Sequence, residues 1–251
     1  MQVFAFGVKR THTFMIVDLH CHILPEMDDG SNSVEMSVAM LCRMAEQGID
    51  FVCATSHYYA EENTIQTFCA RRNAAMEQLQ AVLPEEMPCI LLAAEVAFFS
   101  GISDCLELDK LCIEGTQTLL LEMPFQRWTQ QEVDEITSLV LDRRYQVVLV
   151  HPERFCFVDA NLELLSRLTT LPIGLQINAS TLLHWRSRKD GLDLLQMAYA
   201  PLLGSDCHNL TTRPPNLLRG REIVRKKLGD AFLKEMDQSA ETMVQKVRLT
   251  G

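Results

Sequence analysis

The chain has 251 residues, of which 47% are hydrophobic, and its formal net charge is −10. This length and hydrophobic content suit one large domain, while the acidic balance argues against a nucleic-acid-binding surface and the longest apolar runs are too short to cross a membrane. The nine cysteines include no Cys-x-x-Cys pair, so we expect reduced thiols in a cytoplasmic protein and not a disulfide framework.

The first predicted strand covers residues 16–22, an apolar and β-branched run that ends in polar residues. Because neighbouring residues of a strand point to opposite faces, we expect Asp18, His20 and His22 to share one face. The other face then carries Val17, Leu19 and Cys21. Two imidazoles at positions i and i+2 can reach the same cation. The turn at 28–30 ends the strand and brings carboxylates back over it.

Six further strands are predicted, each as a short apolar run. They cover residues 51–55, 89–94, 118–121, 147–150, 173–178 and 202–205. Segments with helical periodicity separate them, and the capping-box patterns Asn32-x-x-Glu35 and Thr129-x-x-Glu132 mark two helix starts. Strands that alternate with helices pair in parallel. We therefore expect an α/β fold, first as a TIM-like (β/α)7 barrel and second as an open doubly wound sheet. In either case residues 15–251 make up a single domain, and residues 1–14 are an N-terminal extension of unknown role.

Ionisable side chains stand at the ends of most predicted strands. They are His20, His22, His57, Glu95, Glu122, His151, Asp206 and His208, with Asp29 on the first loop. Five of the seven histidines of the chain belong to this set, a concentration that chance would rarely produce. The carboxyl ends of parallel strands converge on one site, where so many carboxylates need a counter-charge. Nitrogen and carboxylate ligands together favour Zn²⁺, Mn²⁺ or Fe²⁺ over Ca²⁺ and Mg²⁺.

Nine side chains are too many for one metal ion, so the set predicts two or three ions that share a carboxylate. Such a cluster lowers the pKa of a bound water and supplies a hydroxide nucleophile, an arrangement typical of phosphate ester hydrolysis. Arg154 and Arg213 follow two of the predicted ligands on loops at the same end of the fold. Because a guanidinium binds phosphate through two parallel N–H groups, we expect this pair to hold the substrate phosphate.

Five stretches of the sequence, taken in order, resemble motifs of the polymerase and histidinol phosphatase superfamily of metal-dependent phosphoesterases. The stretches are IVDLHCHILPEMDDG at 16–30, CATSHYY at 53–59, LLLEMPF at 119–125, VLVHPERF at 148–155 and LLGSDCHNLTTR at 202–213. Within the superfamily they are most similar to the tyrosine-protein phosphatases of bacterial capsular and exopolysaccharide synthesis. The resemblance covers about residues 15–230, and the ordered combination is much more specific than any one stretch.

The resemblance implies a distorted seven-stranded barrel with three divalent metal ions, typically manganese, bound by all nine residues of the set. It implies that Glu95 is the shared carboxylate, that Asp29 also takes part in catalysis, and that Arg154 and Arg213 bind the phosphate. The implied substrate is a phosphotyrosine on the tail of a membrane-associated bacterial tyrosine kinase. The chain departs from the family where Thr55-Ser56-His57 replaces the usual Thr-Pro-His and in its N-terminal extension. Both departures concern the fit of the substrate more than the metal ligands.

Three other interpretations stay open. The same chemistry would serve a small-molecule phosphatase, such as one that acts on histidinol phosphate. Cys207 and Arg213 form a Cys-x5-Arg, the signature of cysteine-dependent tyrosine phosphatases. The segment between them lacks the glycines that cradle phosphate, and we expect Cys207 to point away from the ligands on either side of it. The third interpretation is a purely structural metal site, although such a site is closed by protein ligands and needs no arginines beside it.

Overall fold

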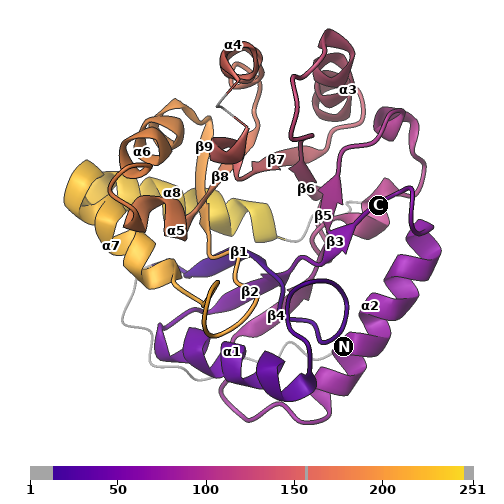
Figure 1. The fold of residues 1–251 in the computed structure, drawn as a ribbon, viewed down its shortest axis with the longest axis vertical. Helices are drawn as coiled ribbons and strands as arrows, with labels where there is room; N and C mark the ends of the chain where they lie inside the picture. Colours follow the sequence, from indigo (N-terminus) through magenta and orange to yellow (C-terminus); the bar gives the residue numbers. More distant parts are fainter. Residues whose placement is uncertain (1–13, 156–157, 246–251) are drawn as a thin grey trace.

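The structure, a computed structural model, describes residues 14–155 and 158–245. In these ranges the helices surround a central group of strands (Figure 1). The strands are β1 (Val17–Cys21), β2 (Phe51–Ala54), β3 (His57–Tyr58), β4 (Cys89–Leu92), β5 (Glu95–Ala97), β6 (Thr118–Glu122), β7 (Gln146–Val150), β8 (Gly174–Asn178) and β9 (Ala200–Gly204). The α-helices are α1 (Val34–Glu46), α2 (Ile65–Gln80), α3 (Gln130–Leu141), α4 (Asp159–Leu168), α5 (Ala179–Leu183), α6 (Arg188–Met197), α7 (Leu217–Leu228) and α8 (Asp230–Val244), and the 3₁₀ helices are η1 (Ile102–Asp104), η2 (Leu108–Leu111) and η3 (Pro152–Arg154). The predicted N-terminal extension lies outside the described residues except for its last residue, Phe14.

All strand pairs are parallel, but they form two sheets. The order is β1–β2–β4 in the first sheet and β3–β5–β6–β7–β8–β9 in the second. Two of the predicted strands are interrupted near their carboxyl ends, so that β2 and β3 flank residues 55–56, and β4 and β5 flank residues 93–94. The expected parallel α/β class is confirmed. A closed seven-stranded (β/α)7 barrel is not confirmed, because these interruptions leave the described residues without one continuous closed sheet.

Hydrogen bonds outside the regular ladders join the two sheets where their edges meet. On one side the amide of Glu114, just before β6, donates to the carbonyl of Leu92 in β4 at 2.8 Å. On the other side, where β1 meets β9, the amide of His22 donates to the carbonyl of Cys207 at 2.9 Å. The strands therefore surround a shared interior although they form no single sheet.

A small apolar core fills this interior. It is formed by side chains of β1, β2, β4, β6, β7 and β9 together with the last turn of α8. The hydroxyl of Thr118, the first residue of β6, donates to the carbonyl of Met243 in α8 at 2.7 Å. Helix α8 thus covers the amino ends of the strands and leaves their carboxyl ends for other side chains. A larger apolar core lies between the strands and the surrounding helices.

Strand β1 is irregular where it approaches its carboxyl end. Its register against β2 shifts just before Cys21, which indicates a β-bulge, and a bulge changes the direction of the side chains that follow it. Val17 and Leu19 belong to the interior core, whereas Cys21 belongs to the outer core. The strict alternation that placed these three residues on one face is therefore wrong. The bulge allows His20 and His22 to turn toward the interior directly after Leu19.

Side-chain caps start several of the helices. Thr129 and Glu132 form the predicted capping box of α3. In α1 the cap is Ser33 and not Asn32, because the Ser33 side chain accepts a hydrogen bond from the amide of Met36. None of the helices in the described ranges combines the length and apolar character of a membrane span.

Candidate metal centre

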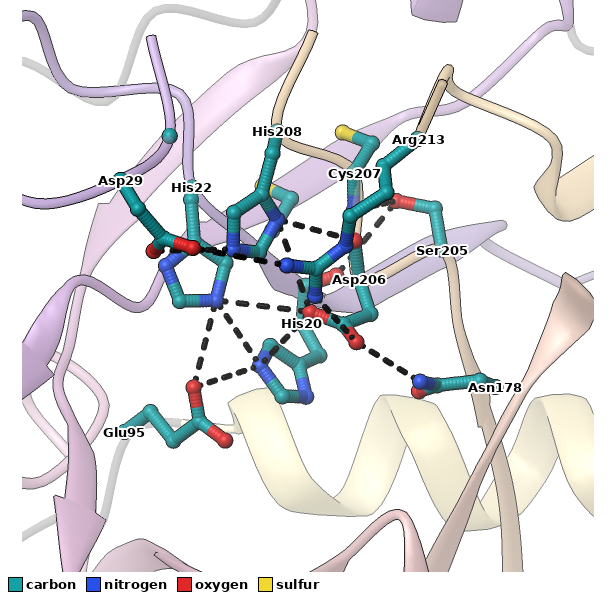
Figure 2. Close-up of polar contacts among 12 residues, drawn as sticks. His20, His22, Asp29, Glu95, Asn178, Ser205, Asp206, Cys207, His208 and Arg213 are labelled. Carbon is teal, nitrogen blue, oxygen red and sulfur yellow. Dashed lines mark hydrogen bonds and ion pairs between the residues drawn. The ribbon is translucent and has the colours of Figure 1, made fainter. Parts of the chain in front are cut away.

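A compact cluster of ionisable side chains lies at the carboxyl ends of the strands (Figure 2). Its members are His20 and His22 of β1, Asp29 on the following loop, His57 of β3, Glu95 of β5, Glu122 of β6, His151 after β7, and Asp206 and His208 after β9. The structure thus brings together every residue that the sequence predicted as a ligand. Seven of the nine are buried, while the side chain of His57 is 17% exposed and that of Asp29 is 66% exposed.

Glu95 lies at the middle of the cluster. Its Oε2 is 3.1 Å from His20 Nε2 and 3.2 Å from His22 Nε2. The same oxygen is 3.0 Å from His57 Nδ1, and the other oxygen, Oε1, is 2.7 Å from His151 Nε2. The parallel pairing of β3 with β5 places His57 directly opposite Glu95. One buried carboxylate therefore contacts four imidazoles that come from β1, β3 and the end of β7.

The ligand atoms form three overlapping groups, each small enough to surround one cation. Within each group the atoms lie within 4.8 Å of one another. The groups are His20, His22 and Glu95; His57, Glu95 and Glu122; and His22, Asp29, His57 and His208. Asp206 adjoins the first group, with its Oδ1 3.5 Å from His22 Nε2. His151 adjoins the second, with its Nε2 3.5 Å from Glu122 Oε1.

The hydrogen bonds of His20 and His22 orient their free ring nitrogens toward Glu95. His20 Nδ1 lies 2.7 Å from Gln176 Oε1, and His22 Nδ1 lies 2.8 Å from Asp28 Oδ2. Each neutral ring therefore holds its proton on Nδ1 and presents Nε2 as an acceptor. The two Nε2 atoms are 3.2 Å apart, and both face Glu95 Oε2. Three electron-rich atoms converge in this way, and a metal cation fits between them.

Buried polar atoms that form no hydrogen bond mark the same place. Among the described residues they include His57 Nδ1, Glu95 Oε2 and His208 Nε2, none of which has a hydrogen-bond partner. Buried polar atoms in folded proteins nearly always have one. These atoms are all of kinds that bind metals, and a donor set of imidazoles and carboxylates suits Mn²⁺, Zn²⁺ or Fe²⁺. The residues present thus fit a cluster of divalent ions.

Carboxylate charge dominates the electrostatics of the cluster. Burial alone would lower the pKa of His22, but hydrogen bonds with Asp206, Asp28 and Glu95 raise it well above its usual value. Burial and then the charge of Glu95 raise the pKa of Glu122 to about 7. Both shifts reflect carboxylates that require positive charge nearby, which either protons or metal cations can supply. Because protons and metal ions compete for these atoms, metal binding should weaken as the pH falls.

Strand β8, which has no predicted ligand, contributes two positioning residues that the sequence reasoning missed. Gln176, the partner of His20, donates from Nε2 to Asn178 Oδ1 at 2.9 Å, and Asn178 Nδ2 donates to Asp206 Oδ2 at 2.7 Å. A chain of hydrogen bonds thus links two predicted ligands through β8. Gly204 leaves the space for it, since a Cβ atom at 204 would lie 2.7 Å from Gln176 Nε2. The available sequence signal is the pair of amides at i and i+2 in an otherwise apolar strand.

Asp28 is a third positioning residue that the sequence did not single out. Besides its contact with His22, its Oδ2 accepts a hydrogen bond from the amide of His57 at 2.9 Å. Its Oδ1 accepts from the amide of Gly30 at 2.9 Å. One carboxylate therefore fixes two predicted ligands and the turn between them, next to the predicted ligand Asp29.

Replacing Gln176 by leucine should weaken metal binding about 10–100-fold, because the hydrogen bond that orients His20 is lost. Gln176→Glu is the matched control, since its carboxylate still accepts from His20 Nδ1 although it cannot donate to Asn178. Titration of metal-free protein with Mn²⁺, followed by the electron paramagnetic resonance of the free ion, measures both affinities. Native affinity in the leucine variant would contradict the positioning role.

Two of the predicted ligands have unusual backbone conformations. His151 has φ = 33° and Asp206 has φ = 50°, both in the left-handed region, which costs about 1–3 kcal/mol for such residues. Backbone hydrogen bonds hold them there: the amide of His151 donates to the carbonyl of Gln176 at 2.7 Å, and that of Asp206 to the carbonyl of His20 at 2.8 Å. In both residues the strained backbone lies where a strand ends and the cluster begins.

Both arginines that were predicted to bind phosphate converge on Asp206. Arg154 Nη2 lies 2.6 Å and Arg213 Nη2 lies 2.8 Å from Asp206 Oδ2. Their side chains are 36% and 35% exposed, so both can be reached from solvent. They form a cationic edge beside the cluster, which Figure 2 shows for Arg213.

Cys207 points away from the cluster. It is fully buried in the outer core. Its backbone forms an isolated parallel β-bridge with that of Cys21 where β1 meets β9. The expectation that Cys207 lies behind the site is confirmed. A thiol in this position has no access to a phosphate held by the arginines, so the Cys-x5-Arg spacing carries no catalytic meaning here.

Comparisons with known proteins point to one group of enzymes. Residues 16–244 match the model of a family described as capsular polysaccharide synthesis, CpsB/CapC. The chain is 27% identical over 238 residues to the tyrosine-protein phosphatase YwqE of Bacillus subtilis, an alignment that covers 91% of each protein. It is 25% identical over 223 residues to the tyrosine-protein phosphatase CpsB of Streptococcus agalactiae, which covers 85% of this chain and 91% of that protein.

A solved structure has a similar fold. It comes from the crystal structures of YwqE from Bacillus subtilis and CpsB from Streptococcus pneumoniae, which are described as metal-dependent tyrosine phosphatases. The two structures superpose with a TM-score of 0.79 at 24% sequence identity, over 91% of this chain and 94% of the other. At this level of identity the likeness shows a common fold.

Proposed function

Because the chain belongs to the CpsB/CapC family of capsular polysaccharide synthesis proteins, we propose that it is a metal-dependent phosphatase that hydrolyses phosphotyrosine in proteins. The similar proteins YwqE and CpsB are both named tyrosine-protein phosphatases. The observation that carries the proposal is the position of Glu95, whose carboxylate lies within 3.2 Å of four imidazoles. Two arginines stand beside this cluster.

We propose that three metal ions bind, one in each of the three overlapping groups of ligand atoms. All nine predicted residues would serve as their ligands, and Glu95, which belongs to two of the groups, would be shared. Mn²⁺ is the first candidate, while Zn²⁺ and Fe²⁺ also suit the donor set. When bound, such ions supply a Lewis acid that acidifies water and offsets the charge of a phosphate.

Arg154 and Arg213 bind the phosphate in this proposal. Both donate to Asp206 Oδ2, which holds the two guanidinium groups side by side, and their remaining N–H groups can donate to phosphate oxygens. As the bond between phosphorus and the tyrosine oxygen breaks, the guanidinium groups stabilise the charge on the remaining phosphate oxygens. The phenol that forms from the leaving group has a pKa of about 10. Departure of the phenolate therefore depends less on a proton donor than departure of a serine alkoxide does.

Asp29 is proposed as a further catalytic residue. It is the most exposed carboxylate of the set, and its Oδ1 lies 3.2 Å from His208 Nε2. Its Oδ2 lies 3.7 Å from Arg213 Nη1. Asp29 therefore stands between the predicted ligands and the arginine edge, where it can accept a hydrogen bond from the attacking water.

The finer parts of the proposal concern the substrate and its setting. The proposed substrate is the phosphotyrosine tail of a bacterial tyrosine kinase that acts in capsule or exopolysaccharide synthesis. The description of the family, capsular polysaccharide synthesis, supports this setting. The thiols of Cys21 and Cys207, which form no disulfide, support a cytoplasmic location. Residues 15–251 are proposed to act as one phosphoesterase domain. The alternative of a histidinol phosphatase has no support among the relatives named above.

The metal-loaded protein should hydrolyse a phosphotyrosine peptide much faster than a phosphoserine peptide or histidinol phosphate, because the arginine edge and the phenolate leaving group suit the first. Chelation should abolish this activity and added Mn²⁺ should restore it. Release of inorganic phosphate from the three substrates, before and after chelation, tests both statements. Full activity in chelator, with less than one metal ion per chain, would contradict the proposed function.

A further inference from the structure

A groove of about 520 Å³ opens beside the metal centre. The loops that follow β3, β5 and β6 line it, together with the first turns of α3. These are the strands that carry His57, Glu95 and Glu122. Side chains that form its walls include Tyr59, Phe98, Phe99 and Pro124.

Two contacts make the groove continuous with the cluster. The ring of Tyr59, which lines the groove, stacks on the ring of His57 with their centroids 5.5 Å apart. The amide of Phe98, which also lines the groove, donates to the carbonyl of Glu122 at 2.8 Å. A substrate whose phosphate occupies the centre can therefore extend into this groove.

The groove carries negative charge. Among the residues that the structure describes, its lining includes Glu61, Glu62, Glu132 and Glu135 and contains no lysine or arginine. The carboxylate of Glu132 is engaged in the capping box of α3. Glu61 and Glu62 are exposed, and their carboxylates form no hydrogen bond or ion pair within the described part of the chain. These two carboxylates are therefore available to a ligand.

We propose that this groove binds the peptide segment next to the phosphotyrosine and selects a lysine or arginine in that segment. This inference rests on the proposed function. Each residue of an extended peptide adds about 3.3–3.6 Å to its length. Side chains close to the phosphotyrosine in the sequence can therefore reach the groove while the phosphate stays at the arginines. Glu61 and Glu62 attract a basic side chain and repel an acidic one. The ring of Tyr59 supplies a face on which a cationic side chain can rest.

The test uses three phosphotyrosine peptides that differ only in having lysine, glutamine or glutamate on both sides of the phosphotyrosine. With full-length, Mn²⁺-loaded protein at low salt, kcat/KM should be about tenfold higher for the lysine peptide than for the glutamate peptide. The double variant Glu61→Gln and Glu62→Gln should reduce this ratio to about twofold or less. Its turnover of phenyl phosphate, which has no flanking residues, should stay unchanged.

The matched control is the double variant Glu85→Gln and Glu86→Gln. These exposed glutamates lie between α2 and β4, at the amino ends of the strands, so the change in net charge is equal but remote. The control should keep the native preference. A ratio that falls equally in both variants would show a general charge effect and overturn the proposal.

Binding is measured separately with the same peptides carrying a non-hydrolysable phosphonomethyl-phenylalanine, by fluorescence anisotropy. If binding discriminates between the peptides through Glu61 and Glu62 but no phosphotyrosine is hydrolysed, the groove is supported and the proposed hydrolysis is wrong. If all three peptides are hydrolysed at equal rates and bound equally, the groove proposal is wrong and the phosphatase proposal stands.

Discussion

Replacing Glu95 by glutamine should lower phosphotyrosine turnover at least about 10³-fold, which corresponds to roughly 4 kcal/mol at the barrier. The amide keeps the shape of the side chain, but it is uncharged and one of its two terminal atoms is a donor. It therefore cannot accept on both sides between the four imidazoles that contact Glu95, and a shared ligand is lost. The measurement is kcat on a phosphotyrosine peptide in excess Mn²⁺, with the metal content of the same sample.

The fold of this variant should survive, because an amide is less costly to bury than an unpaired carboxylate. In chelator its thermal unfolding should resemble that of the native chain, whereas the rise in Tm on adding Mn²⁺ should shrink, since ions that bind only the folded state stabilise it. Glu114→Gln, at an exposed position just before β6, serves as the control with the same chemical change. Native turnover in a folded Glu95→Gln sample that holds little metal would contradict the central role of Glu95.

Asp206→Asn and Cys207→Ser, in adjacent residues, should give opposite results. Asp206 faces His22 and holds both arginines, so its amide variant should lose about 10²-fold or more of the turnover. Cys207 is buried in the outer core, so its serine variant should keep most activity and lose about 1–3 kcal/mol of stability from the buried hydroxyl. A thiolate nucleophile would reverse the order, because an unactivated serine hydroxyl is hardly ionised at neutral pH.

Both variants are assayed on phosphotyrosine peptide with added Mn²⁺, and urea unfolding gives their stabilities. Cys53→Ser is a suitable control, since Cys53 is fully buried in the interior core and lies on β2, which has no predicted ligand. An active Asp206→Asn variant beside an inactive but folded Cys207→Ser variant would refute the metal mechanism.

The sequence predicted the cluster better than it predicted the strands that carry it. Ligands such as Glu95 and His151 follow short apolar runs, and the end of a parallel strand is a topological position that survives small errors in the strand limits. The interruptions at 55–56 and 93–94 were not predictable in the same way. The periodicity of a sequence indicates which face of a segment is apolar, but not where its hydrogen-bonded pairing is interrupted. Residues such as Thr55 and Ala93 are compatible with either a regular strand or an interruption.

The bulge in β1 and the role of β8 were also beyond the sequence. Val17, Leu19 and Cys21 alternate regularly in the sequence, and only the pairing with β2 shows that the register shifts before Cys21. Gln176 and Asn178 have no charge and match no motif, and the spacing of two amides in an apolar strand is too weak a signal to assign a role without their distances to His20 and Asp206. Positioning residues act through contacts that depend on the whole fold.

The junction between β1 and β9 joins segments of the chain that are far apart in the sequence, and the metal site lies at this junction. There the amide of Ser205 donates to Asp18 Oδ1 at 2.9 Å, a contact between residues 187 positions apart. Closing a chain loop of that length costs roughly 4–5 kcal/mol of entropy. An ion held by His20 and Asp206, as proposed above, would span the same junction and act as a reversible cross-link between the two ends of the chain. The supply of metal would then set how often the molecule opens between β1 and β9, and we expect metal-loaded protein to resist proteolysis longer than metal-free protein.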